Sequence, residues 1–405
     1  MFRRCIVSLA FIAALEMTAV ATAAEKQYGP GVSDTEIKIG NTGPYSGPAP
    51  SYSVIGRAES AHFAMINEQG GINGRKINFI SRDDAYSPPK TLEVVRKLVE
   101  QDEVLLLFNT LGTPPNLAIR GYLNENKVPQ LFVASGDPQF NDPKHYPWTI
   151  GFAPSYRFEG RVYGRYILKN LPDAKIAVLY QNDDLGKGYL RGLREGLASK
   201  ADKLIVATQS YETTDATVDP QVLLLQGSGA DTMLTVAIPK FAAQTIRKIY
   251  DLGWKPNHFL TNISASVGMV MQPAGPEKTT GILTAGYLKE PTDPEWHDTP
   301  EYQEWLSWMK KYNPSGNVAD GANVYAYSVT QTMVAVLKEC GDNLTRENIM
   351  KQAASIRELK LPMLYPGIIV STSAEDFAPV KQMGFARFDG TTLRPFGDVM
   401  SAEDN

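Results

Sequence analysis

Two pairs of adjacent aspartates are the residues of this chain best suited to acid–base chemistry. Asp83-Asp84 and Asp183-Asp184 both follow apolar runs, and a pair of carboxyl groups can give and take a proton. Neighbouring residues on an extended segment point to opposite faces, however, so the two carboxyls of a pair do not converge. We therefore expect turn formation or helix capping from both pairs, and keep only Asp184 as a candidate for contact with a ligand.

The sequence shows no other pattern for catalysis or metal binding. The four histidines, His62, His145, His258 and His297, are scattered and have no metal-ligand spacing. The chain also lacks a Gly-x-Ser-x-Gly nucleophile elbow and a Gly-x-x-x-x-Gly-Lys phosphate loop. We predict no catalytic residue, no metal site and no cofactor, and hence no enzyme.

The strongest binding signal is the stretch 104–118, an apolar run that stops at Gly112 and continues as a predicted helix. Thr113 can cap this helix, and Pro114 and Pro115 suit its first turn. Because the free amides and the dipole of a helix N-terminus attract anions, this stretch can receive one. The alternative is an ordinary strand-to-helix turn that binds nothing, and the rest of the chain has to decide between them.

The elements around this stretch predict a parallel, doubly wound sheet. The apolar runs do not alternate with polar residues, which is typical of strands covered on both faces. Strands are expected at 37–43, 76–83, from 104 and at 129–134, alternating with helices at 54–68, 88–101 and 114–126. This order is typical of an α/β domain with helices on both sides of its sheet.

The same alternation then repeats, so we predict a second α/β lobe and a cleft between the two. Strands are expected at 148–152, 175–180, 204–209, 232–237 and 258–261, with helices at 156–170, 188–199, 218–226 and 240–252. The order changes after Gly281. A strand at 281–286, helices at 300–312, 323–339 and from Thr345, an apolar segment at 368–370 and a hairpin joining 383–388 to 393–396 follow there.

The chain begins with a predicted secretory signal peptide at 1–24. Arg3 and Arg4 precede an apolar run, and the small residues 21–24 suit cleavage. Removing Cys5 with this peptide leaves Cys340 alone, so no intramolecular disulfide is expected. The net charge of −4 gives no support for binding nucleic acid or anionic membranes. We expect a mature chain without stable membrane insertion.

Several motifs in the two halves resemble one known family. They are Ile37-Lys38-Ile39-Gly40, the run Asn67-Glu68 to Gly74-Arg75, Asp83-Asp84 with Pro88-Pro89, Val128-Pro129, and Asp184-Leu185-Gly186-Lys187-Gly188. Together they resemble the type I periplasmic solute-binding proteins of ABC importers for branched-chain amino acids. The resemblance covers nearly the whole mature chain.

This resemblance implies two doubly wound lobes joined by a hinge of three crossovers, with ligand held between the carboxyl ends of the strands. We expect the crossovers near 149–153, 281–285 and 366–370. The first lobe would comprise 25–150 and 286–365, and the second lobe 151–285 and 366–405. It also implies a periplasmic location, a membrane ABC permease as partner, a monomer, and closure by a hinge motion.

The family's amino-acid binders hold the ligand carboxylate on the first lobe. Here the matching positions are Thr113, the turn Ala134-Ser135-Gly136, and Tyr52. All of them retain suitable chemistry, so the resemblance implies a carboxylate ligand. Tyr156 and Tyr287 are further candidates for the cleft.

The second lobe departs from the pattern of amino-acid binders. Those relatives hold the ammonium with an acid after the strand that matches 258–261, whereas this chain has Asn262-Ile263-Ser264 there, and Leu185 and Ile238 stand where tyrosines are common. An unpaired buried ammonium is costly. We therefore expect a small carboxylate with an apolar or aromatic body, whose distal hydroxyl could meet Asn262 or Ser264.

Three alternatives stay open at this stage. Asp184 or Asp320 could replace the missing acid, and the ligand would then be a branched-chain or other hydrophobic amino acid. More remote are a ligand-sensing module and an enzyme on the same fold.

Overall fold

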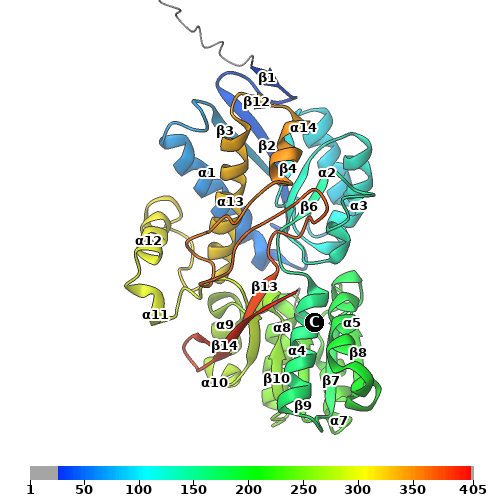
Figure 1. Cartoon of the computed structure of the whole chain (residues 1–405). Coiled ribbons are helices and arrows are strands. Elements are labelled where there is room, and N and C mark those ends of the chain that lie inside the picture. The colour runs from blue at the N-terminus through cyan, green and yellow to red at the C-terminus, as the bar shows by residue number, and fades with distance from the viewer. Residues whose placement is uncertain (1–25, 403–405) are drawn as a thin grey trace, which may run out of the picture.

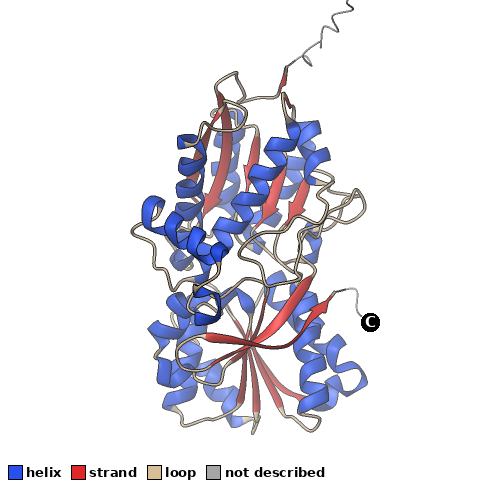
Figure 2. Cartoon of the chain, turned by 60° about the vertical axis from the view of Figure 1, so that its left-hand side comes forward, coloured by secondary structure: helices blue, strands red, loops and turns tan. Residues whose placement is uncertain are grey.

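The computed structural model describes residues 26–402 and contains two sheets, each with helices on both sides (Figures 1 and 2). The predicted signal peptide, with Cys5, lies outside the described residues. No helix among residues 26–402 is long and apolar enough to cross a membrane.

The first sheet has five parallel strands in the order β3-β2-β4-β5-β6. The strands are β2 (Glu36–Gly43), β3 (Lys76–Asp83), β4 (Leu106–Phe108), β5 (Gln130–Val133) and β6 (Thr149–Gly151). Every residue of β4 and β5 is inaccessible to solvent, which explains why their sequences do not alternate between polar and apolar residues. A separate small sheet joins β1 (Gln27–Tyr28) to β12 (Asn343–Leu344).

The second sheet has seven strands in the order β14-β13-β11-β10-β9-β7-β8. Its strands are β7 (Ile176–Gln181), β8 (Ile205–Tyr211), β9 (Thr232–Val236), β10 (Asn257–Leu260), β11 (Leu283–Gly286), β13 (Gln382–Phe388) and β14 (Leu393–Ser401). The hairpin of β13 and β14 is antiparallel and forms one edge, as the Asp389-Gly390 turn predicted.

Most helices lie between successive strands along the chain. Their bounds are α1 (Ser53–Glu68), α2 (Pro88–Glu100), α3 (Thr113–Glu125), α4 (Tyr156–Asn170), α5 (Asp184–Leu197), α6 (Ala201–Leu204), α7 (Asp219–Gly227), α8 (Pro239–Asp251), α9 (Gln272–Ala274), α10 (Pro276–Thr279), α11 (Pro294–His297), α12 (Pro300–Tyr312), α13 (Gly321–Cys340) and α14 (Arg346–Ala353). Thr299 and Thr345 cap α12 and α14, because each hydroxyl accepts a backbone N–H of its own first turn.

Helix α5 begins four residues earlier than the predicted 188, for a reason visible in its cap. The Asp183 carboxylate accepts the N–H of Gly186 and so starts the helix at Asp184. This brings Leu185 into the first helical turn. The double aspartate at 83–84 instead forms a turn: Asp83 accepts the N–H of Ala85 and Asp84 that of Tyr86.

The chain passes between the two sheets three times. It leaves the first sheet after β6, returns after β11 to place α13 against α1, and passes back before β13 (Figure 1). The third passage contains no strand at 368–370, where Val370 makes a single bridge to Leu359. These passages lie side by side and bring the carboxyl ends of both sheets face to face.

Candidate ligand-binding site

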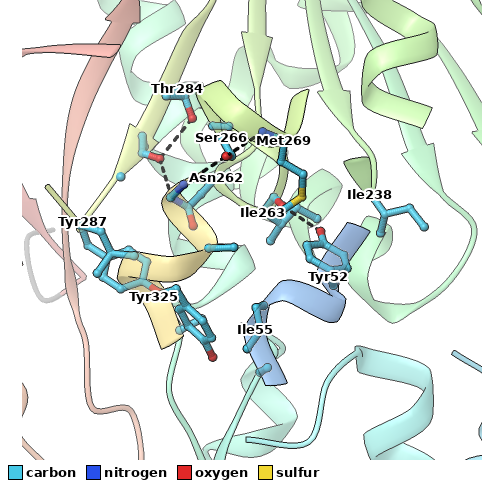
Figure 3. Close-up of a pocket in the computed structure, with 18 of the residues that line it drawn as sticks. Tyr52, Ile55, Ile238, Asn262, Ile263, Ser266, Met269, Thr284, Tyr287 and Tyr325 are labelled. Carbon is cyan, nitrogen blue, oxygen red and sulfur yellow. Dashed lines mark hydrogen bonds between the residues drawn. The ribbon is translucent and has the colours of Figure 1, made fainter. Parts of the chain in front are cut away.

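A cavity of about 170 Å³ lies between the two sheets at the carboxyl ends of their strands (Figure 3). The first sheet contributes the turns after β4 and β5, and the second sheet contributes those after β7, β9, β10 and β11. An apolar cavity of roughly 150 Å³ is enough to hold a benzene ring in another protein. The space is therefore of the size that a small ring-bearing molecule requires.

Most of the predicted residues lie at this cavity, together with Tyr287. Those that line it are Tyr52, Ala134, Ser135, Tyr156, Leu185, Ile238 and Asn262. Four others, Thr113, Gly136, Asp184 and Ser264, are not among the lining residues.

Thr113 lies one layer behind the cavity wall and does not cap its helix. The cap of α3 is Gly112, at φ 101°, and it provides no side-chain hydrogen bond. Thr113 is fully buried, and its Oγ1 lies 2.7 Å from the Oγ of Ser135. Pro114 and Pro115 have no N–H, so the first turn has little to offer an anion. Thr113 therefore orients Ser135, whose own side chain reaches the cavity.

Gly136 shapes the wall instead of lining it. A Cβ at this position would approach the carbonyl oxygen of Pro154 to 2.3 Å and the ring of Tyr156 to 2.6 Å. The Gly136 carbonyl accepts the N–H of Tyr156 at 2.7 Å. The absent side chain thus allows Tyr156, from the second sheet's side, to face Ser135.

Asp184 and Ser264, both predicted to contact the ligand, do not line the cavity, for different reasons. Asp184 is exposed at the start of α5, with its side chain in solvent. Ser264 is buried, and its hydroxyl donates to the carbonyl oxygen of Ala237. Neither side chain is placed to meet a molecule in the cavity.

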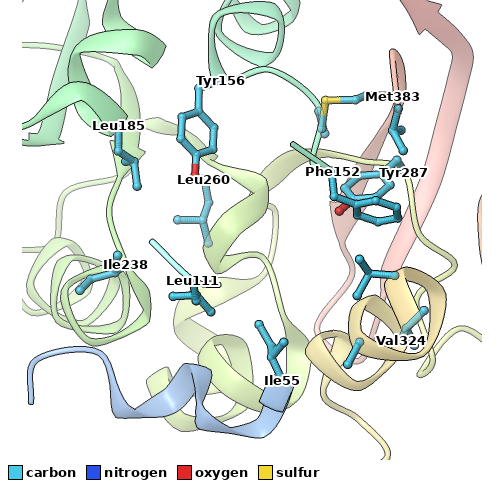
Figure 4. Close-up of a cluster of buried hydrophobic side chains, with 14 of the residues drawn as sticks. Ile55, Leu111, Phe152, Tyr156, Leu185, Ile238, Leu260, Tyr287, Val324 and Met383 are labelled. Atoms are coloured by element: carbon cyan, nitrogen blue, oxygen red, sulfur yellow. The ribbon is translucent and has the colours of Figure 1, made fainter. Parts of the chain in front are cut away.

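The turns after β7, β9 and β10 form a mostly apolar wall of the cavity. Leu185 and Ile238 lie on one side of the cavity with Tyr156 above them, and Tyr287 lies on the other (Figure 4). Ile263 and Met269 extend this wall (Figure 3). No acidic side chain follows β10, as the residues 262–264 predicted.

Asn262 is a polar residue in that wall, and the buried carboxyl group of Glu159 holds it in place. Its N–H donates to Glu159 Oε1 at 2.7 Å, and its Nδ2 donates to the Ala285 carbonyl at 3.2 Å. Glu159 also accepts the hydroxyls of Tyr163 and Tyr189, both at 2.7 Å. Burial raises the pKa of Glu159 to about 7, although these donors oppose the rise.

Tyrosines that the sequence did not single out also surround the cavity: Tyr86, Tyr325 and Tyr365. Burial raises the pKa of each phenol, so each stays neutral. Tyr86 lies on a turn, Tyr325 on the first part of α13 and Tyr365 on the third passage. No periodic pattern in the sequence marks these residues as facing a cleft. An aromatic lining favours flat, apolar ligands.

The two sides of the cleft are in direct contact. The Tyr52 hydroxyl donates to the Ile263 carbonyl at 2.8 Å, as the dashed line in Figure 3 shows. The Gly268 N–H donates to the Ala319 carbonyl at 2.8 Å, and Ser266 donates to Asp320 at 2.9 Å. These bonds join the turns of the second sheet to α1 and α13, so the cleft is closed.

Within residues 26–402, no cluster of His, Cys, Asp or Glu is arranged to hold a metal ion. His62 and His258 are buried, and burial lowers the pKa of each to about 4, so both are neutral at pH 7. His258 Nε2 lies 2.8 Å from the Thr235 hydroxyl, beneath the sheet's carboxyl edge.

Comparison with known proteins agrees with this geometry. Residues 36–392 match the family model described as periplasmic binding protein. A Leu/Ile/Val-binding protein homolog of Brucella suis is 24% identical over 332 residues, covering 81% of this chain and 85% of the relative.

Solved structures share the fold at low identity. A branched-chain amino acid ABC transporter protein from Thermus thermophilus with bound valine has a TM-score of 0.81 at 16% identity, covering 92% of this chain and 98% of that one. A solute-binding protein from R. palustris in complex with 4-hydroxybenzoate has a TM-score of 0.75 at 16% identity, covering 90% and 97%.

The predicted α/β fold and the resemblance are therefore confirmed. The family is that of periplasmic binding proteins, and the fold is shared with solute-binding proteins of ABC transporters. With a family match over most of its length and a closed cleft lined for a small molecule, this chain belongs to the periplasmic binding protein family.

Proposed function

We propose that this protein captures a small organic carboxylate with an apolar or aromatic body and delivers it to an ABC permease. The predicted signal peptide would direct it to the periplasm, where it would act as a monomer without catalytic activity. The proposed lobes are 25–150 with 286–365, and 151–285 with 366–405. Closure of the second lobe over a ligand held by the first would create the surface that the permease recognises.

The observation that carries this proposal is the apolar wall made by the second sheet's turns. Leu185, Ile238, Ile263 and Met269 line it, and the turn after β10 supplies Asn262 instead of an acid. An α-ammonium placed against this wall would lose its water without gaining a counter-ion, at a cost of several kcal/mol. The same wall favours an aliphatic chain or a ring.

The carboxylate would bind at the hydroxyl groups of Ser135 and Tyr156. The Ser135 hydroxyl lines the cavity and is oriented by Thr113, and Tyr156 faces both of them. Burial raises the pKa of Tyr156, and the neighbouring hydroxyls partly oppose this rise. A neutral phenol and a serine hydroxyl can both donate hydrogen bonds to a carboxylate.

The alternative is a hydrophobic amino acid. The Brucella relative is named a Leu/Ile/Val-binding protein homolog, and one structural neighbour holds valine. In this chain the Asp320 carboxylate accepts the hydroxyl of Ser266, and it could pair with the ammonium of such a ligand.

A thermal-shift panel of matched acids tests the proposal. Benzoate, cinnamate and 3-phenylpropanoate should raise the melting temperature, because a ligand at a hundredfold its dissociation constant stabilises by about 2.7 kcal/mol. Leucine, valine and phenylalanine should shift it less. A shift with leucine or valine but with none of the three acids would overturn the proposal in favour of the alternative.

A further inference from the structure

Glu290 is a buried acid at the cavity that the carboxylate proposal leaves without a role. It follows β11 on the segment 287–291, all of which lines the cavity. The residue is only 6% exposed. A carboxyl group in such a place is costly unless something in the fold or in a ligand uses it.

Only one of its two oxygens is satisfied by the described residues. Oε1 accepts the N–H of Thr292 at 3.1 Å and the Thr292 hydroxyl at 2.9 Å. No described residue donates to Oε2. Oε2 is therefore available for a hydrogen bond with a further partner.

No cation in the neighbourhood offsets this acid. Lys289 is adjacent in sequence, but its Nζ lies over the ring of Trp296, 5.3 Å from the centroid. Arg394 pairs with Asp293 and Asp389. Burial raises the pKa of Glu290 to about 8, and the nearby carboxyl of Asp320 adds to the rise.

The segment that carries Glu290 is fixed in place. The Lys289 N–H donates to the Met363 carbonyl at 2.9 Å, and the hydroxyl oxygens of Thr292 and Thr392 lie 2.7 Å apart, within hydrogen-bond distance. The carboxyl group is thus held between the third passage and the β13–β14 hairpin. A rigidly held acceptor discriminates between ligands more strongly than a mobile one.

Glu290 and Ser135 have separate surroundings. Ser135 is next to Thr113, Gly136 and Tyr156, whereas the groups that act on Glu290 are Thr292, Asp320 and Asp293. Tyr287, on the segment that leads to Glu290, lies across the cavity from Leu185 and Ile238 (Figure 4). The cavity thus has a second polar group away from the Ser135 hydroxyl.

We propose that Glu290 is a specificity-determining residue, which accepts a hydrogen bond from a hydroxyl or amine on the part of the ligand remote from its carboxylate. This inference rests on the proposed function and narrows the ligand class to carboxylates that carry such a donor. A purely apolar distal group would leave Oε2 without a partner and would be selected against.

The test uses two series of acids on the mature protein. Benzoates and cinnamates carrying para-hydrogen, para-methyl, para-hydroxyl or para-aminomethyl groups are titrated by calorimetry into wild type, Glu290→Leu and Glu290→Gln. Glu295→Gln is the matched control, because Glu295 is an exposed acid on the next turn of the same connection.

In wild type and in Glu295→Gln, the para-hydroxyl or para-aminomethyl acid should bind at least about tenfold more tightly than the para-methyl acid. Glu290→Leu should abolish this preference while binding the unsubstituted acid as wild type does, which also shows that the variant is folded. Glu290→Gln distinguishes a hydroxyl from an amine on the ligand. The tighter binding of the para-hydroxyl acid should survive, because the amide oxygen still accepts a hydrogen bond, whereas the tighter binding of the para-aminomethyl acid should be lost.

Equal affinities for methyl and donor-bearing acids in wild type, or a donor preference that survives Glu290→Leu, would overturn the role of Glu290 and leave the carboxylate proposal standing. If no acid of either series binds wild type while leucine or valine does, the proposed function fails and this inference fails with it.

Discussion

The polar groups of the cavity act in pairs, in which one residue faces the cavity and another positions it. Ser135 faces the cavity and Thr113 holds its hydroxyl at 2.7 Å. Asn262 faces the cavity and Glu159 holds its backbone at 2.7 Å. The residues behind the wall should therefore influence affinity less than the residues they position.

Substitutions of Ser135 and Thr113 should distinguish the residue that contacts the ligand from the residue that positions it. We expect Ser135→Ala to weaken a carboxylate ligand by about tenfold to a hundredfold, since a hydrogen bond to a charged group contributes about 1.5–3 kcal/mol. Thr113→Val should weaken ligand binding less than Ser135→Ala does, and Thr113→Ser, which keeps the hydroxyl, should bind as tightly as wild type. Calorimetric titration of the three variants checks this order. A larger loss in Thr113→Val than in Ser135→Ala would place the direct contact on Thr113.

The sequence could predict some of these residues and not others, for physical reasons. Ser135 and Tyr52 lie in turns whose motifs match the family, so their places at the cavity could be predicted. Thr113 is at the predicted turn, but its buried hydroxyl depends on a neighbour from another turn. Glu290 stands in an irregular segment after β11, where neither hydrophobic periodicity nor a turn motif reveals burial.

At the scale of elements, the N-terminal part of α4 organises the second sheet's side of the site. Glu159 on this helix gathers Tyr163, Tyr189 and the N–H of Asn262, which ties α4 and α5 to the turn after β10. The close packing of α4 on α5 depends on glycines, since a Cβ at Gly160 would lie 2.4 Å from the Tyr189 carbonyl oxygen. The turn that carries Asn262 is thus fixed by buried groups.

The raised pKa of Glu159 makes its contribution to stability depend on pH. The folded pKa of about 7 lies above the ordinary 4.5, so the folded state holds a proton that the unfolded state releases. This contribution is complete below about pH 4.5 and is lost as the pH rises through about 7, with a size of about 3 kcal/mol.

The free energy of unfolding of wild type minus that of Glu159→Gln should therefore decrease as the pH rises from about 4.5 to about 7, measured by denaturant unfolding. Subtracting the variant removes the titration of the other groups. A difference that is constant across this range would mean that Glu159 is ionised throughout.

Element boundaries show what local sequence can specify. α12 and α14 begin close to their predicted starts at 300 and 345, because their caps, Thr299 and Thr345, make contacts within one turn. The sequence allows Asp183 either to form a turn or to cap a helix, and because it caps α5 the helix begins four residues before the predicted 188. The segment 368–370 is no strand of either large sheet, although Ile368 and Val370 are buried and Val370 forms a bridge to Leu359.

For the whole molecule, the decisive feature is the closed cleft. The Tyr52–Ile263 hydrogen bond spans from the start of α1 to the turn after β10. Bonds of this kind form only when the two sides meet, so they contribute to the closed state and not to either sheet alone. A ligand-bound molecule would differ from a free one in having its two sides closed on each other.

Removing that hydrogen bond should favour opening. Tyr52→Phe keeps the ring but loses the hydroxyl, and a lost neutral hydrogen bond of about 1 kcal/mol should raise the ligand dissociation rate severalfold. Tyr45→Phe is the matched control, because its hydroxyl contacts Ser81 at 2.5 Å on the first sheet's side. Stopped-flow dissociation measures both. Equal rates in the two variants would remove Tyr52 from closure.

The most direct test of the account is a calorimetric comparison of 3-phenylpropanoate with phenylalanine, which differ by the α-amino group alone. The apolar wall of Leu185, Ile238, Ile263 and Met269 predicts that the acid without the amino group binds more tightly, by about tenfold or more. Tighter binding of phenylalanine, or binding of leucine in the absence of any binding of 3-phenylpropanoate, would contradict the account.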